Sequence, residues 1–254
     1  MGTPNIMLIG CGPHAKRVYV PKLKEVENEF RIKLKAVVEL EEKEEDVKKF
    51  ISNYFENIEY IFIEKFESKY RQNLPKEIES RLDNIVKKEN INSVIIATDP
   101  LNHMQYALWA LKNKLHILMD KPISTYDNIS NNVEQAEQLK RDYELLVKNY
   151  SSNQAFIVNA QRRFLPQFQI VQDLVNEIAS KYGMPITSIQ STHSDGQWRL
   201  PDEVLKLRYH PLLGWGKVSH SGYHFIDMAS KMVKDSFKEA NKTFDEISVF
   251  TKFI

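Results

Sequence analysis

The sequence predicts an α/β protein whose N-terminal part is a doubly wound, mainly parallel sheet. A short apolar run, residues 5–9, stands near the start of the chain and leads directly into a glycine-rich turn. Further apolar runs at 36–38 and 93–97 alternate with charged, helix-forming stretches. Strands separated by helices form parallel sheets covered on both faces, and strands buried in this way are apolar almost throughout.

The composition is that of an ordinary globular protein. The 254 residues are 42% hydrophobic and 27% charged, enough for one large domain or two smaller ones. Since 35 Lys and Arg face 34 Asp and Glu, no net field favours nucleic acid or a membrane surface as partner. The single cysteine, Cys11, excludes an intramolecular disulfide, and no run resembles a membrane span or secretion signal. We therefore expect a cytoplasmic protein.

The glycine-rich turn predicts a nucleotide site. Gly10 and Gly12, with a small residue at Ala15, fit the Gly-x-Gly-x-x-Gly/Ala turn between a strand and a helix. Amide groups at the start of that helix suit a pyrophosphate, although the motif alone also fits an ordinary strand–turn–helix join. Cys11 is expected to pack rather than to react. The residues expected to line the cofactor here are Gly10, Gly12, Pro13, His14 and Ala15.

The second strand, residues 32–40, carries an acid near its carboxyl end. In a dinucleotide-binding fold, an acid at the position of Glu39 accepts hydrogen bonds from the adenosine ribose and repels a 2′-phosphate. This favours NAD over NADP. The alternative is that Glu39 only begins the acidic run 39–46, which opens a solvated helix.

The next elements continue the alternation. A short strand at 60–63 and an amphipathic helix at 75–89 precede a buried strand at 93–98. A helix then leads to a strand at 115–119, which ends in Asp120-Lys121-Pro122. Ligands of doubly wound sheets bind beyond the carboxyl ends of the strands. The residues that fall at such ends are Gly10, Glu39, Thr98 and Lys121.

The rest of the chain predicts a second domain. We expect a Rossmann domain at 1–122, with linking elements to about 150, and a second domain at 151–254. The elements predicted after Pro122 are a helix at 128–140, strands at 144–148 and 155–160, a helix at 161–180, an alternating strand at 186–193, a helix around 219–227 and a strand at 246–254. Because the chain stops inside a strand, we expect a sheet that is incomplete or closed by a partner.

The ordered combination of motifs resembles the glucose–fructose oxidoreductase/inositol dehydrogenase (Gfo/Idh/MocA) family. It comprises the glycine turn, Glu39, Ala-Thr-x-Pro-x-x-His at 97–103, acid-Lys-Pro at 120–122 and His-x-x-Asp at 224–227. The resemblance implies an NAD(P)-dependent dehydrogenase of a sugar, polyol or related cyclic alcohol. It also implies a second, α+β domain whose open, mainly antiparallel sheet covers the nicotinamide and often mediates homo-oligomerisation.

The resemblance assigns roles residue by residue. Lys121 matches the lysine that contacts the reacting hydroxyl and often the nicotinamide ribose, and His224 matches the general acid/base. Asp227 matches the acid that ends the His-x-x-Asp motif. Arg162 or Arg163 falls where arginines often lie near the cofactor. The further residues implied to line the cofactor are Thr98, Pro100, His103, Asp120, Lys121, Arg162, Trp198 and Arg199.

The sequence departs from the family pattern at two positions. Asp120 replaces a glutamate and keeps its charge. His220 stands where many members carry an aspartate, four residues before His224, so the two imidazoles share a helix face. Each disfavours protonation of the other, which suits a neutral base awaiting an alcohol proton. A zinc site formed with His210 is disfavoured because no cysteine or matched acid accompanies the histidines.

The chemistry follows from the residue types alone. Removing hydride from a carbinol carbon requires a base for the hydroxyl proton and a cation for the developing alkoxide, which a histidine and Lys121 supply. We therefore expect an oxidoreductase that transfers hydride between NAD and a sugar-like alcohol or ketone. The alternative is a non-catalytic family member that binds a dinucleotide or sugar and regulates or scaffolds a partner. His220 favours the alternative, whereas Lys121 together with His224 argues against it.

Overall fold

A computed structural model describes residues 3–66, 72–127, 129, 132–192 and 222–243. The chain divides into two compact units, Met1–Asn159 and Ala160–Ile254, and each is treated by itself. The division falls a few residues beyond the predicted linking elements, because the strand at 156–158 pairs with the sheet of the first unit.

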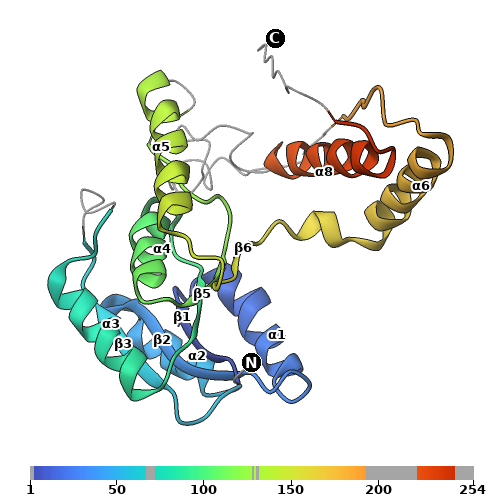
Figure 1. Cartoon of the computed structure of the whole chain (residues 1–254). Coiled ribbons are helices and arrows are strands. Elements are labelled where there is room, and N and C mark those ends of the chain that lie inside the picture. Colours follow the sequence, from blue (N-terminus) through green and yellow to red (C-terminus); the bar gives the residue numbers. More distant parts are fainter. Residues whose placement is uncertain (1–2, 67–71, 128, 130–131, 193–221, 244–254) are drawn as a thin grey trace, which may run out of the picture. The chain divides into compact units, whose positions relative to one another are not determined.

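The first unit is built on a six-stranded parallel sheet, which confirms the predicted doubly wound architecture (Figure 1). Its strand order is β3-β2-β1-β4-β5-β6, so consecutive crossovers run in one direction from β1 to β3 and in the other from β4 to β6. The turning point lies between β1 and β4, where ligands of such sheets bind. The strands are β1 (Asn5–Ile9), β2 (Lys33–Leu40), β3 (Glu59–Ile63), β4 (Ser93–Ile96), β5 (His116–Met119) and β6 (Phe156–Val158).

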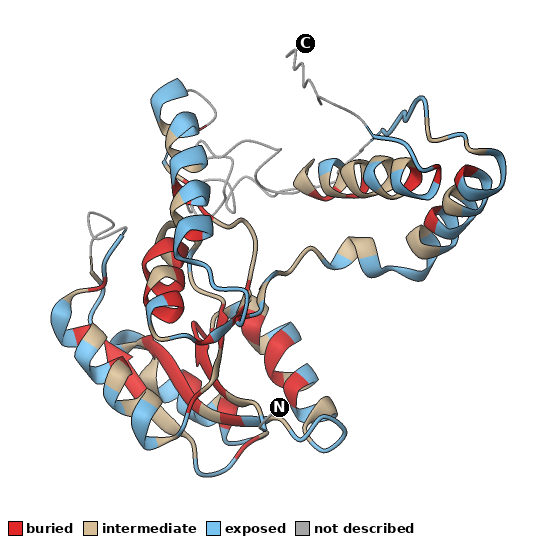
Figure 2. Cartoon of the chain, in the orientation of Figure 1, coloured by how far each residue is buried: buried red, intermediate tan, exposed pale blue. Residues whose placement is uncertain are grey.

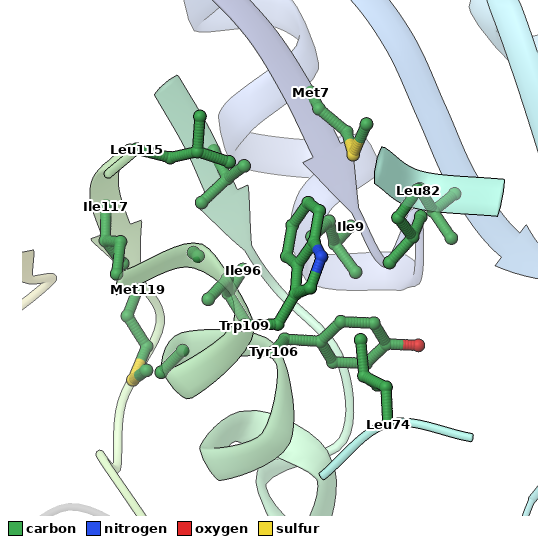
Figure 3. Packing of buried hydrophobic residues seen from close by; sticks show 14 of the residues in the cluster. Met7, Ile9, Leu74, Leu82, Ile96, Tyr106, Trp109, Leu115, Ile117 and Met119 are labelled. Atoms are coloured by element: carbon green, nitrogen blue, oxygen red, sulfur yellow. The ribbon is translucent and has the colours of Figure 1, made fainter. Parts of the chain in front are cut away.

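Helices cover both faces of this sheet, as the apolar strands require. Successive residues of β1 point to opposite faces, so Met7 and Ile9 enter one buried cluster and Ile6 and Leu8 the other. The first cluster packs against α3 and α4 (Figure 3), the second against α1 and α2, and Figure 2 shows the sheet buried between them. The helical segments are η1 (Ala15–Tyr19), α1 (Val20–Val26), η2 (Glu41–Lys43), α2 (Glu44–Ile51), α3 (Lys76–Lys88), η4 (Pro100–Asn102), α4 (His103–Lys112) and α5 (Val133–Asn149).

The predicted strand at 144–148 is wrong, since these residues form the last turns of α5. The apolar run at 145–147 is compatible with a strand, but burial along this segment follows a helical period. Asp142 and Leu146, four residues apart, are buried, whereas Tyr143 and Val147 are exposed. The buried Asp142 carboxylate accepts hydrogen bonds from the hydroxyls of Ser124 and Tyr126, which fix α5 to the chain that follows β5.

The second unit contains two long helices that pack together, α6 (Pro166–Tyr182) and α8 (Tyr223–Glu239), preceded by a helical turn η6 (Gln161–Phe164). Gly183 ends α6 in the left-handed conformation, with φ +61°, as the predicted turn requires. Residues 186–192 form no strand, contrary to prediction, and the described part of this unit offers no strand for them to pair with. Instead the Ile186 N–H donates to the Ser236 hydroxyl of α8, at 3.2 Å.

The strand expected at 246–254 lies outside the described residues. Among the helices that the structure describes, none is long and apolar enough to cross a bilayer.

Replacing Leu82 by alanine tests the packing of α3. The Leu82 side chain is fully buried, so Leu82→Ala is expected to lower the free energy of unfolding by about 2–5 kcal/mol. Val133→Ala on α5 is the control, because Val133 is 75% exposed and its loss is expected to cost no more than about 0.5 kcal/mol. Urea unfolding followed by circular dichroism measures both, and equal midpoints would contradict this packing.

Candidate functional site

Gly10 is required by the backbone that surrounds it. It follows β1 with φ +90°, a conformation that side chains disfavour. A Cβ atom on Gly10 would lie 2.7 Å from the backbone of Ala97 and Thr98, just past β4. On the other side, the Gly10 N–H donates to the Val38 carbonyl of β2, at 2.9 Å. The first glycine therefore lets the ends of three strands converge.

Gly12 has a different environment. A Cβ atom there would meet no protein atom within 4 Å, so the protein's own packing does not exclude a side chain. Three residues further, Ala15 begins a π-helical turn and is fully buried, and the Lys16 N–H donates to the Gly12 carbonyl at 3.0 Å. The open space at Gly12 is where a ligand could approach the backbone and the start of this helix.

Glu39 is buried and connects the end of β2 to the glycine turn. One carboxylate oxygen accepts from the Cys11 N–H at 2.8 Å. The other accepts from the Leu40 N–H at 2.9 Å and from Lys43 Nζ at 3.3 Å. Glu39 thus belongs to β2, and the helical run begins only at Glu41. Its contacts place a carboxylate beside the glycine turn.

Cys11 packs in the apolar cluster of this face. Burial raises the pKa of its thiol to about 11, so the thiol stays protonated at neutral pH and is a poor nucleophile.

The loop after β4 carries Thr98 and Pro100. Asp99 caps the short helix η4, since its carboxylate accepts from the Leu101 N–H at 3.0 Å. Thr98 and Pro100 are partly exposed, and both lie beyond the carboxyl end of β4. This loop adjoins the glycine turn, because the backbone of Thr98 is one of the groups that a Gly10 side chain would strike.

Asp120 and Lys121 follow β5 at the same edge of the sheet. The Asp120 N–H donates to the Ile96 carbonyl at 2.8 Å, and its carboxylate accepts from the Lys121 N–H at 2.9 Å. His14 Nε2 lies 3.7 Å from the other Asp120 oxygen, which joins the glycine turn to the lysine loop. The peptide bond between Lys121 and Pro122 is cis.

Two polar residues that the sequence did not single out, Tyr19 and Asn159, lie close to His14 and Asp120. Asn159 Nδ2 donates to the Tyr19 hydroxyl at 2.7 Å, just past β6. Burial, and after it the Asp120 carboxylate, raises the pKa of Tyr19. Tyr19 also packs edge-on against the His14 ring. The only sequence signal for the pair of Tyr19 and Asn159 was a tyrosine one turn after Ala15.

His103 lies beneath these loops, with no exposed surface in this conformation. Its Nδ1 is 2.7 Å from the Pro122 carbonyl oxygen and its Nε2 is 3.2 Å from that of Thr98. The histidine expected to line the cofactor therefore faces the backbone of the two loops.

The second unit holds the other predicted residues. His224 is buried at the start of α8, with Nε2 2.6 Å from the Tyr223 hydroxyl. Arg163 forms a bidentate ion pair with Asp227, and this hydrogen bonding raises the pKa of Arg163. The guanidinium of Arg162 lies over the Phe225 ring, 5.6 Å from its centroid. The predicted residues outside the described part of the chain are Trp198, Arg199, His210 and His220.

The described residues contain no group of three or more His, Cys, Asp or Glu side chains able to hold a metal ion.

The parallel sheet and the glycine turn at its turning point define the class of Rossmann-fold proteins. Within that class the chain belongs to the Gfo/Idh/MocA family, since the family model for oxidoreductases with an NAD-binding Rossmann fold matches residues 5–148. No curated protein matches the chain.

Solved structures resemble the chain at low sequence identity. A dehydrogenase from Thermus thermophilus in complex with NAD and UDP-GlcNAcA matches with a TM-score of 0.58 and 15% identity, over 91% of this chain and 63% of that chain. The scyllo-inositol dehydrogenase of Lactobacillus casei, with bound NAD(H) and scyllo-inositol, has a TM-score of 0.46 and 18% identity over 70% and 42%. A 3-ketoreductase from Actinomadura kijaniata in complex with NADP and TDP-benzene has a TM-score of 0.44 and 19% identity over 69% and 43%. The chain thus spans less than two thirds of each of these proteins.

The two glycines provide a matched pair of variants. Gly10→Ala combines an unfavourable φ with a backbone clash and is expected to lower stability by about 1–3 kcal/mol. Gly12→Ala should unfold at nearly the wild-type midpoint, because its methyl group enters open space. Thermal unfolding of the two variants compares them, and an equally stable Gly10→Ala would refute the close approach.

Proposed function

We propose that the protein is an oxidoreductase that transfers hydride between a nicotinamide cofactor and a sugar, polyol or related cyclic alcohol or ketone. The observation that carries the proposal is the open space at Gly12, at the strand edge that also presents Glu39 and Lys121. Membership of an oxidoreductase family supports it, as does the sugar nucleotide bound by the Thermus protein of the same fold.

The residues present fit a dinucleotide. Gly12 leaves room for a pyrophosphate to approach backbone amides, and Pro13, His14 and Ala15 follow at the helix start. The buried Glu39 carboxylate retains acceptor capacity for ribose hydroxyls beside its bond to the Cys11 N–H. Thr98, Pro100 and Asp120 border the same edge, and Arg162, Trp198 and Arg199 remain proposed cofactor residues. The bound nicotinamide would supply the hydride acceptor or donor.

The chain's own residues supply the proton chemistry. We assign to Lys121 the stabilisation of the developing alkoxide, because a cation is worth most where negative charge forms in a site shielded from water. His224 is proposed as the base that takes the hydroxyl proton, and His220 as a second catalytic residue. The Tyr223 hydroxyl, in hydrogen-bond contact with His224, would orient the imidazole.

Further parts of the proposal concern the whole protein. We propose that residues 1–122, with linking elements to about 150, bind the dinucleotide. Residues 151–254 would bind substrate and hold copies of the chain together. The cytoplasm is the proposed location, based on the single cysteine.

Cofactor and substrate are tested together. NADH and NADPH are titrated by fluorescence, and sugars, polyols and their ketones are then screened for a change in reduced cofactor. Gly12→Ala is the control, since it is expected to keep its fold and lose affinity. No binding of either cofactor would overturn the proposal, and binding without turnover of any compound would favour a regulatory protein.

Cofactor preference is expected to follow the charge at Glu39. Glu39→Gln keeps an oxygen to accept the Cys11 N–H but removes the charge that repels a 2′-phosphate. The ratio of NADPH to NADH affinity is expected to rise about tenfold, equivalent to about 1.4 kcal/mol. Lys43→Met, which removes the cation beside Glu39, should shift the ratio in the opposite direction. Unchanged ratios in both variants would exclude the ribose role.

Lys121→Ala is expected to lower turnover to a small rate that is still measurable, while the protein keeps its fold. Loss of a group that stabilises transition-state charge lowers kcat by about 100–1,000-fold. Lys121→Arg keeps the charge and serves as the control, with a smaller loss. Rapid-mixing measurement of reduced cofactor gives kcat, and near-normal turnover by Lys121→Ala would remove Lys121 from the mechanism.

A further inference from the structure

The lysine loop, residues 120–122 after β5, is held in place on both sides of Lys121. On one side the Asp120 N–H is bonded to the Ile96 carbonyl at the end of β4. On the other side the Pro122 carbonyl lies 2.7 Å from Nδ1 of His103, the first residue of α4. The backbone of Lys121 is thus bracketed by two contacts that come from different elements.

Both oxygens near the His103 ring are carbonyls, which only accept hydrogen bonds. Burial lowers the pKa of His103, although the Pro122 carbonyl and then the Asp120 carboxylate oppose this, and the ring is therefore neutral. A neutral imidazole has one N–H. The shorter contact is to Pro122, so the proton belongs on Nδ1, and Nε2 faces the Thr98 carbonyl at 3.2 Å without a proton to donate.

We infer that His103 is a positioning residue for Lys121: its Nδ1–H···O=C bond to Pro122 fixes the turn from which the lysine side chain extends. This assignment replaces direct contact with the cofactor, which the complete burial of His103 excludes in this conformation. Its effect on turnover rests on the proposed function. A lysine side chain has four rotatable bonds, so a displaced backbone moves its ammonium group easily, and a shift of about 1 Å can cost about a hundredfold in rate.

Two carboxamide substitutions separate the two ring nitrogens. The side-chain nitrogen of asparagine lies near the place of Nδ1, and that of glutamine near the place of Nε2. His103→Asn therefore keeps a donor toward Pro122, whereas His103→Gln directs its donor toward Thr98. Both replacements are polar and uncharged, so each controls for the other in folding, which thermal unfolding verifies.

The two variants are expected to differ in kcat. His103→Asn should keep kcat within about threefold of wild type, while His103→Gln should lose tenfold or more, up to about a hundredfold. NADH affinity should change little in either. In the Lys121→Ala background the two His103 variants should have the same rate, because the lysine they position is absent. Equal kcat for the two single variants, or a His103→Gln effect that persists without Lys121, would overturn the inference.

A second readout does not depend on turnover. In protein labelled with ¹⁵N-lysine, the Lys121 amide resonance is identified by its disappearance in Lys121→Arg labelled in the same way. It should shift in His103→Gln and stay in place in His103→Asn. If it does so while wild type turns over no substrate, the positioning role stands and the proposed reaction fails. If it stays in place in both variants, or shifts equally in both, the positioning role is refuted.

Discussion

No side chain fits at Gly10, and the arrangement of the site depends on that exclusion. The turn after β1 passes so close to the chain leaving β4 that even a methyl group would strike the Ala97–Thr98 peptide. At the same point the Gly10 N–H is bonded to β2. The ends of three strands are thereby brought together at the turning point of the sheet, where a doubly wound fold binds ligands. Gly10, which the protein packing requires, is therefore followed two residues later by Gly12, where the packing leaves space.

Carboxylates stabilise each turn at this edge. Glu39, Asp99 and Asp120 each accept a hydrogen bond from a backbone N–H in a turn, at Cys11, Leu101 and Lys121 respectively. Hydrogen bonds of this charged kind are stronger than neutral ones, so the loops that carry the proposed cofactor residues are preorganised. The same acids supply the negative charge beside Lys121 and at the proposed ribose site. The carboxylates that stabilise the turns are therefore also the charged groups of the proposed site.

The sequence was sufficient to predict the elements whose signal is local. The strands of the sheet are apolar runs, and Gly10, Glu39, Thr98 and Lys121 were placed at strand ends because each follows such a run. The strand predicted at 144–148 failed because three apolar residues in succession fit either period, and only the packing of α5 decides between them.

Partners distant in sequence could not be predicted. The bond from Cys11 to Glu39 spans 28 residues and the one from Asn159 to Tyr19 spans 140, and nothing in either local pattern specifies them. For His103 the motif gave the position of the residue but not the direction of its ring. In the second unit, apolar and polar residues alternate at 186–192, but the described residues of this unit include no strand with which they could pair.

The histidines show why burial, rather than residue type, assigns a role. His14 is half-buried beside Asp120, so its ring keeps surface that a ligand at the glycine turn could contact. His103 has the same side chain but no surface, and its ring can act only on the backbone around it. A long cationic side chain benefits most from such a neighbour, because its own flexibility provides no fixed geometry. The acid-Lys-Pro turn and the buried histidine nineteen residues before Pro122 therefore act together. The turn carries the lysine charge, and the histidine fixes the backbone from which the lysine side chain extends.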